Sequence, residues 1–354
     1  MDDQWSVLKS LFANDATELS IAHRRALMPS GGPGSDWETP RVAASADSLQ
    51  HSASKRPPRS PRTRLGSIAP VTMAGACWVV TSADSRFWSI LTCFIASLRE
   101  VALYEAQIAI IDYGLEPWQR EKLGELGITV VAPHGRYALV IDRYLTLAEY
   151  FRNNAEDTIL YFDADIWFAD SIGEIFANHS ILTGKLGAAK DVWNCDYYLK
   201  CSDPAVHPSV ERALAENIRD YGQTLQAGFI AGSARAWARY ANLLTALLDE
   251  GFARDQWGTD ALALNLYAAL YARHFALLPI TYNAPPLWGV VREGTRFFAT
   301  KFDTDSLYRQ AHGRIPVRAI HCTSAVRHRT DLGLYFGDVY PEILEQWKLR
   351  LAHR

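Results

Sequence analysis

Two aspartates one residue apart follow a run of large apolar side chains in the segment DTILYFDADIWFAD, residues 157–170. The apolar run predicts a buried strand over 158–162, so Asp163 and Asp165 stand where that strand ends. In an extended segment, alternation points both side chains of an Asp-x-Asp pair to the same side, where two carboxylates resist joint ionisation. A divalent cation removes this repulsion, and Mg²⁺ and Mn²⁺ suit oxygen ligands. The pair therefore predicts a metal site; the alternative is one Asp that caps the next helix beside a solvated one.

The elements around this pair alternate between strands and helices. Short apolar runs predict strands over 77–83, 106–114, 127–133, 158–162 and 185–191, and shorter ones over 276–283 and 317–325. Amphipathic or capped segments predict helices over 85–101, 116–126, 144–151, 234–250 and 259–274. The glycine-containing segment 225–233 is expected to be a broken strand or a bend. This alternation predicts an α/β domain with a central, mostly parallel sheet covered on both faces, and ligands gather outside the carboxyl ends of such strands.

The N-terminal part of the chain differs in composition from the rest. Residues 1–28 are expected to form a short helical segment, and residues 29–70, rich in Ser, Pro and Arg, a disordered linker. The single folded domain is placed at 71–354. The basic stretch SKRPPRSPRTR within the linker offers peripheral contact with an acidic membrane, although such stretches are more often simply solvated.

Composition excludes several classes of function. The chain has 354 residues, of which 49% are hydrophobic, and a net charge of −3, so no overall positive field exists to hold nucleic acid. Charged residues and glycines break every apolar stretch before the roughly 18 residues of a membrane span, and the acidic start does not resemble a secretory signal. Five cysteines without a CxxC pair argue against a disulfide framework or zinc ribbon. We therefore expect a cytoplasmic protein with no transmembrane segment.

A series of motifs in one order resembles a known family. The segments VVTSADSRFWSILTCFIASL, YFDADIWF, GAAKD, QAGFIAG, TDALALN, LPITYN and IHCTSAVRH are similar to those of GT-A fold, Rossmann-like glycosyltransferases. The resemblance is to the retaining family 8 type, which includes glycogenin and lipooligosaccharide galactosyltransferases, and it covers about residues 77–330. It implies a single GT-A catalytic domain that uses a nucleotide-sugar donor.

The resemblance also implies roles for individual residues at the donor site. The base and ribose of the donor are expected to contact Thr81, Ser82, Ala83 and Asp84. The expected ligands of Mn²⁺ or Mg²⁺ are Asp163, Asp165 and His321. The diphosphate is expected to contact Arg143 and Arg327. A histidine nitrogen beside two carboxylates suits Mn²⁺ better than Mg²⁺.

Three further residues are expected to face the transferred sugar, namely Asp191, Gln226 and Asp260. Carboxylate and amide groups exchange hydrogen bonds with sugar hydroxyls, and the glycine that follows Gln226 by two positions lets a ligand approach the backbone closely. Asp191 and Asp260 are equally compatible with helix caps or turns. The chain departs from the family pattern at Ala261, where an amide is usual, and the upstream pair Asp255 and Gln256 offers a substitute.

The expected function is metal-dependent transfer of a hexose from a nucleotide diphosphate sugar, a UDP-sugar, to an acceptor hydroxyl with retention. The acceptor is a glycan, a lipid-linked sugar or a protein; the sequence does not choose among them. One alternative is a catalytically degenerate GT-A scaffold that binds a nucleotide, a glycan or a protein without turnover. A more distant one is a haloacid-dehalogenase-like phosphatase, which also has an Asp-x-Asp after a strand but near the start of its domain.

Overall fold

The computed structural model describes residues 75–177, 183–191, 195–286, 290–299, 315–322 and 334–353. The described residues all belong to one compact unit. The expected helical segment over 1–28 and the expected linker over 29–70 lie outside them.

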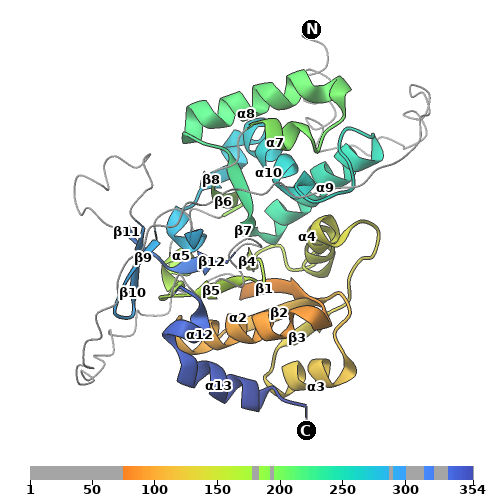
Figure 1. The fold of residues 1–354 in the computed structure, drawn as a ribbon. Helices are drawn as coiled ribbons and strands as arrows, with labels where there is room; N and C mark the ends of the chain where they lie inside the picture. Colours follow the sequence, from red (N-terminus) through yellow and green to blue (C-terminus); the bar gives the residue numbers. More distant parts are fainter. Residues whose placement is uncertain are drawn as a thin grey trace. The chain divides into compact units, whose positions relative to one another are not determined.

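The first part of the unit is a run of strands joined by helices (Figure 1). Its elements are β1 (Cys77–Ala83), α2 (Trp88–Glu100), β2 (Gln107–Asp112), α3 (Pro117–Glu125) and β3 (Thr129–Val131). Helix α3 begins at Pro117, whose fixed φ suits the first helical position, and the Gln119 side chain accepts a hydrogen bond of 2.8 Å from the Glu116 amide. These five elements confirm the ones predicted from the sequence between residues 77 and 133.

The remaining elements carry the site and complete the sheet. They are α4 (Leu139–Tyr150), β4 (Thr158–Phe162), β5 (Ile166–Phe168), α5 (Gly173–Ala177), β6 (Leu186–Lys190), α7 (Cys195–Leu199), α8 (His207–Tyr221), β7 (Leu225–Ser233), α9 (Ala234–Asp249), α10 (Thr259–Leu270), β8 (Phe275–Leu277), β12 (Ala319–His321), α12 (Phe336–Val339) and α13 (Pro341–Arg350). A separate antiparallel sheet consists of β9 (Val290–Glu293), β10 (Arg296–Ala299) and β11 (Ile315–Pro316).

Four predictions about these elements were wrong in their extent. The strand expected over 276–283 is a strand only over Phe275–Leu277, and a 3₁₀ turn covers Ile280–Tyr282. Helix α4, expected from Tyr144, begins at Leu139. The helix expected over 259–274 ends at Leu270, and a 3₁₀ turn covers Ala272–His274. Strand β7 is an unbroken strand of nine residues, because its glycines leave room for neighbouring groups that a Cβ would meet at 3.2 Å or less.

The central sheet has seven strands in the order β3-β2-β1-β4-β7-β6-β8. The pairs β1–β2, β2–β3, β1–β4 and β6–β8 are parallel, whereas β7 is antiparallel to both β4 and β6. The prediction of a mostly parallel sheet is therefore confirmed, with one antiparallel strand in its interior.

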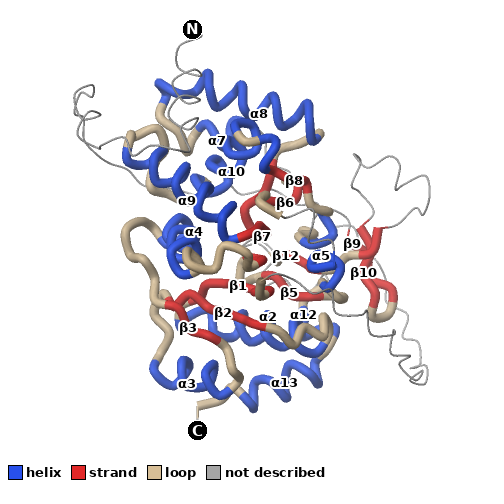
Figure 2. Tube along the Cα trace, turned by 180° about the vertical axis from the view of Figure 1, so that it is seen from behind, coloured by secondary structure: helices blue, strands red, loops and turns tan. Residues whose placement is uncertain are grey.

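Helices cover both faces of this sheet and enclose two apolar cores. On one face, α2, α3 and α13 share an apolar core with Val79 and Leu160; on the other, α4, α8, α9 and α10 share a core with Val80 and Tyr161. Figure 2 shows the two groups of helices. Neighbouring residues of one strand thus belong to different cores, as the alternation of side chains in a strand requires.

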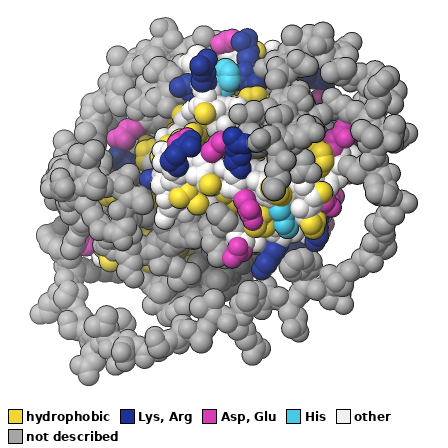
Figure 3. Space-filling model, turned by 90° about the horizontal axis from the view of Figure 1, so that it is seen from above, with side chains coloured by type: hydrophobic (Ala, Val, Ile, Leu, Met, Phe, Trp, Pro, Cys, Tyr) yellow, Lys and Arg dark blue, Asp and Glu magenta, His cyan; other side chains and the backbone are white. Residues whose placement is uncertain are grey.

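The described surface carries charges of both signs. In the face shown in Figure 3, basic and acidic side chains lie among one another rather than in separate patches, in keeping with the small net charge of −3. Among the described residues, no helix combines the length and the apolar character needed to cross a bilayer.

Candidate functional site: an acidic cluster with one histidine

A turn and a short strand pair place the acidic residues. Strand β4 ends at Phe162, and the amide of Ile166 donates to the carbonyl oxygen of Asp163 at 3.1 Å, which closes a turn over the Asp-x-Asp segment. The next strand, β5, pairs antiparallel with β12, so that His321 lies opposite Ile166. The expectation that strand alternation aligns the two carboxylates was wrong, because the segment is a turn.

The cluster formed by Asp163, Asp165 and His321 has the geometry of a cation site. One ligand atom from each residue lies within 4.8 Å of the others. The His321 Nε2 atom is 3.2 Å from Asp165 Oδ1 and 3.7 Å from Asp163 Oδ2. Asp165 and His321 are buried, whereas the Asp163 side chain is 22% exposed. Two carboxylates and an imidazole form a donor set that fits Mn²⁺.

The titration of the cluster reflects its burial and its paired charges. Burial raises the pKa of Asp163, although the nearby charges of Arg143 and His321 oppose that shift. Burial by itself would lower the pKa of His321, but the carboxylates of Asp165 and Asp163 raise it above the usual value. The two aspartates thus favour the protonated form of His321, and His321 in turn opposes the rise in the pKa of Asp163.

Gly228 in β7 is required by the position of the histidine ring. A Cβ atom at this position would lie 2.4 Å from His321 Cε1 and 3.2 Å from Asp163 Oδ2. The Gly228 carbonyl also accepts a hydrogen bond of 2.8 Å from the Asp163 amide. The sequence suggested that the glycine opens the backbone to a ligand, whereas in the structure the space is taken by the His321 ring.

Gln226 contacts the cluster through its histidine. Its Nε2 atom lies 3.3 Å from His321 Nδ1, and its Oε1 atom accepts a hydrogen bond from Asn283 Nδ2. Asn283 was not among the site residues predicted from the sequence. The only signal was its place in the motif LPITYN, which the resemblance includes without a role for the asparagine.

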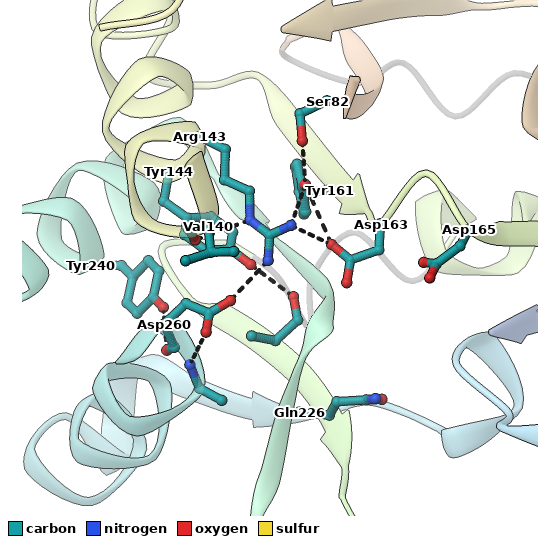
Figure 4. Close-up of polar contacts among 12 residues, drawn as sticks. Ser82, Val140, Arg143, Tyr144, Tyr161, Asp163, Asp165, Gln226, Tyr240 and Asp260 are labelled. Atoms are coloured by element: carbon teal, nitrogen blue, oxygen red, sulfur yellow. Dashed lines mark hydrogen bonds and ion pairs between the residues drawn. The ribbon is translucent and has the colours of Figure 1, made fainter. Parts of the chain in front are cut away.

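Arg143 of α4 joins Asp163 to Asp260, the second residue of α10 (Figure 4). Its Nη1 donates to Asp163 Oδ1 at 2.6 Å and its Nη2 donates to Asp260 Oδ2 at 2.8 Å. The Tyr161 hydroxyl accepts a further hydrogen bond of 3.0 Å from Nη1. Burial opposes the charge of this guanidinium, but Asp163 and the other partners raise its pKa well above the usual value.

Removing this buried cation is expected to destabilise the fold. In Arg143→Met the carboxylates of Asp163 and Asp260 lose their shared partner, which is expected to lower the free energy of unfolding by about 3–5 kcal/mol. Urea denaturation followed by circular dichroism measures the change. The double variant Arg143→Met, Asp260→Leu is expected to recover part of it. If Arg143→Met lowers the free energy of unfolding by less than about 0.5 kcal/mol, as surface substitutions usually do, Arg143 is not a buried partner on which the two carboxylates depend.

The residues expected to hold the nucleotide lie at the end of β1 and in the following turn. Thr81, Ser82 and Ala83 are buried, and Ser82 Oγ forms a hydrogen bond of 3.0 Å with the Tyr161 hydroxyl. The Thr81 hydroxyl makes no hydrogen bond within the described part of the chain. Asp84 caps a 3₁₀ turn by accepting from the amides of Arg86 and Phe87. Ser82 is thus linked to Arg143 through Tyr161.

All three residues expected to face the sugar are hydrogen-bonded to other protein groups. Asp191, after β6, is buried and accepts a hydrogen bond of 2.7 Å from the Tyr198 hydroxyl. Asp260 is bound to Arg143, and Gln226 contacts His321 of the acidic cluster. Arg327 lies outside the described residues.

Asp255 and Gln256, the pair expected to substitute for the missing amide at Ala261, form hydrogen bonds with other parts of the chain. The Asp255 carboxylate accepts from the amide of Ala138 at 2.9 Å, and the Gln256 Nε2 donates to the carbonyl oxygen of Lys200 at 3.1 Å. Ala261 itself is buried, with its amide bound to Asp260 Oδ1. Neither residue of the pair replaces the amide near Asp260 in this arrangement.

Comparison with solved structures defines the fold. The galactosyltransferase LgtC, solved in complex with donor and acceptor sugar analogs, matches with a TM-score of 0.51 at 18% identity, over 77% of this chain and 99% of that chain. The bifunctional glycosyltransferase WbbM, solved in its apo form, matches with a TM-score of 0.52 at 15% identity, over 81% of this chain and 52% of that chain. No protein-family model and no curated protein sequence matches the chain.

The chain therefore has the GT-A fold of glycosyltransferases. Its resemblance to the family 8 type, predicted from the order of sequence motifs, is confirmed for the fold by the match to LgtC. At these identities the likeness defines the architecture, while the activity has to be argued from the site.

Proposed function

We propose that this protein is a metal-dependent glycosyltransferase that moves a hexose from a UDP-sugar to an acceptor hydroxyl with retention. The observation that carries the proposal is the cluster of Asp163, Asp165 and His321 after β4 of a GT-A fold. Ligands of open α/β sheets gather outside the carboxyl ends of the strands, where this cluster lies. The acceptor is a glycan, a lipid-linked sugar or a protein.

The residues of the cluster have distinct tasks in this proposal. Asp163, Asp165 and His321 hold Mn²⁺, or Mg²⁺ in its place, which acts as a Lewis acid on the diphosphate of the donor. Arg143 binds Asp163 Oδ1, while Oδ2 of the same carboxylate faces His321. The guanidinium thus orients the carboxylate and adds fixed positive charge near the developing charge of the leaving diphosphate.

We retain the donor-binding roles that the family resemblance implies, with changes that follow from the contacts of these residues. We propose that the backbone around Thr81, Ser82, Ala83 and Asp84 lies along the base and ribose, since the side chains of these residues are buried or engaged. Arg327 is proposed to contact the diphosphate together with Arg143. Asp191, Gln226 and Asp260 remain the proposed sugar-facing set, with Asp260 held by Arg143.

A screen of UDP-sugars tests the proposal before any acceptor is known. The protein is incubated with UDP-glucose, UDP-galactose or UDP-N-acetylglucosamine, with Mn²⁺ or with EDTA, and released UDP is measured. We expect one donor to release UDP slowly, and only in the presence of Mn²⁺. The release is slow because water, rather than an acceptor hydroxyl, takes up the sugar.

Two other outcomes of this screen would favour the alternative functions, a degenerate GT-A scaffold or a phosphatase. Tight UDP binding without UDP release from any donor indicates a scaffold that has lost turnover. This alternative is raised because Ala261 stands where the family usually has an amide side chain. Release of phosphate from 4-nitrophenyl phosphate, included as a control substrate, indicates a phosphatase.

A further inference from the structure

Three polar side chains from distant parts of the sequence form a chain that ends at the acidic cluster. His321 belongs to β12, Gln226 to β7, and Asn283 follows the 3₁₀ turn Ile280–Tyr282. Ala284 pairs with β12, where its amide donates to Ala319 and its carbonyl oxygen accepts from the His321 amide, both at 3.0 Å. This pairing holds Asn283 beside the histidine strand. We call Gln226 and Asn283 the amide pair.

The direction of the hydrogen bonds in this chain defines the proton on the histidine ring. An amide nitrogen only donates, so Gln226 Nε2 makes His321 Nδ1 an acceptor at 3.3 Å. The proton of the neutral ring is then on Nε2, which lies 3.2 Å from Asp165 Oδ1 and donates to it. The Oε1 atom of Gln226 is held in turn by Asn283 Nδ2.

This arrangement suits the cluster without an ion and conflicts with ion binding. A metal on Nε2 needs the lone pair of that atom, so the ring proton has to be on Nδ1, and Nδ1 then needs an acceptor. Gln226 supplies one when its amide turns over and presents Oε1. Its Nε2 then points to Asn283 and needs an acceptor there.

Asn283 carries an acceptor for this second arrangement. Its Oδ1 atom makes no hydrogen bond within the described residues, although the side chain is fully buried. Turning the Asn283 amide over exchanges the places of Oδ1 and Nδ2, which brings this acceptor to the side of Gln226. When both amides turn over, Asn283 Oδ1 accepts from Gln226 Nε2, and Gln226 Oε1 accepts from His321 Nδ1.

We propose that Gln226 and Asn283 are positioning residues that set the tautomer of His321, and that both amides reverse when a divalent cation binds. Starting from the neutral ring, the reversal moves one ring proton from Nε2 to Nδ1, with no net gain or loss of protons, and frees the Nε2 lone pair. It rests on the proposed metal dependence and adds a role for Gln226 besides contact with the sugar. Outer partners of this kind orient a ligating histidine and hold its tautomer.

Calorimetric titration of the full chain with Mn²⁺ tests the energetic part. Gln226→Met keeps the size of the side chain but removes both hydrogen bonds, and its Kd for Mn²⁺ is expected to rise by about 10–100-fold. Gln226→Glu keeps an acceptor for Nδ1 and is expected to bind Mn²⁺ at least as tightly as the wild type. Thermal unfolding of each variant shows that it is folded.

Nuclear magnetic resonance of ¹⁵N-labelled histidine rings tests the tautomer itself, with Zn²⁺ as a diamagnetic ion. The His321 signals are assigned by their loss in His321→Gln. We expect the neutral ring to carry its proton on Nε2 in the metal-free wild type, and on Nδ1 with Zn²⁺ or in metal-free Gln226→Glu, whose carboxylate only accepts. If Gln226 had only a structural role, its substitution by Glu would not change which ring nitrogen of His321 carries the proton.

Two results separate the failure of this inference from the failure of the proposed function. If the wild type binds Mn²⁺ and Gln226→Met binds it equally tightly, or if the metal-free neutral ring already carries its proton on Nδ1, the amide pair does not set the tautomer. If the wild type binds neither Mn²⁺ nor Zn²⁺, the metal-dependent function fails, and the positioning role fails with it.

Discussion

Asp165→Asn is expected to raise the Kd for Mn²⁺ by at least about 100-fold, because loss of an outer partner alone costs about 10–100-fold and Asp165 is a proposed direct ligand. The amide retains the shape of the side chain while the negative charge is lost. Metal-dependent release of UDP is expected to fall in parallel. Calorimetry with Mn²⁺ and the donor hydrolysis assay measure the two effects.

Asp165 is the better choice of the two aspartates for this experiment. Asp163 also binds Arg143, so its substitution would disturb a buried ion pair as well as the cluster. Asp220→Asn is a matched control, since Asp220 is exposed near the end of α8 and pairs with Arg219. Wild-type Mn²⁺ affinity in Asp165→Asn would overturn the assignment of the cluster as the metal site.

Gly228→Ala is expected to abolish tight Mn²⁺ binding by displacing the histidine ring. The added Cβ would lie 2.4 Å from His321 Cε1 and 3.2 Å from Asp163 Oδ2, contacts whose relief has to shift these two side chains or β7 and so changes the ligand distances. The Kd for Mn²⁺ is expected to rise by at least about 10–100-fold, as for other losses of ligand positioning. The same crowding is expected to lower the free energy of unfolding by about 1–3 kcal/mol.

Gly232→Ala in the same strand separates the two effects. Its Cβ would lie 2.8 Å from the carbonyl oxygen of Lys185 and 3.1 Å from Leu186 Cδ1, both remote from the cluster in sequence. A similar loss of stability with unchanged Mn²⁺ affinity is therefore expected. If Gly228→Ala and Gly232→Ala bind Mn²⁺ equally well, the Gly228 contact does not position the histidine.

The order of strands and helices was largely predictable because its causes are local. Apolar runs such as 158–162 and the Pro117 start of α3 act over a few residues, and both gave elements with the expected bounds or nearly so. The sequence analysis did not predict helices α8 and α13. The three-residue strand β5 was missed as well, because a segment that short has no periodicity to detect; its pairing with β12 defines it.

The candidate site was predictable in its residue types but not in its contacts. Asp163, Asp165 and His321 were expected from motif order, and the structure brings them together. Arg143 was expected on a diphosphate, yet both of its terminal nitrogens bind carboxylates. Asn283 had no predicted role. Side-chain partners of this kind depend on the packing of separate elements, which local sequence does not report.

The sequence by itself determined that an acidic pair closes a buried strand within alternating α/β elements, because apolar periodicity and strand ends are properties of adjacent residues. Only the tertiary structure decided which groups meet that pair. Gln226 and His321 are 95 positions apart, and Arg143 and Asp260 are 117 apart. Their contacts exist because β7, β12, α4 and α10 pack around one end of the sheet, where burial makes each hydrogen bond and charge depend on a partner from another element.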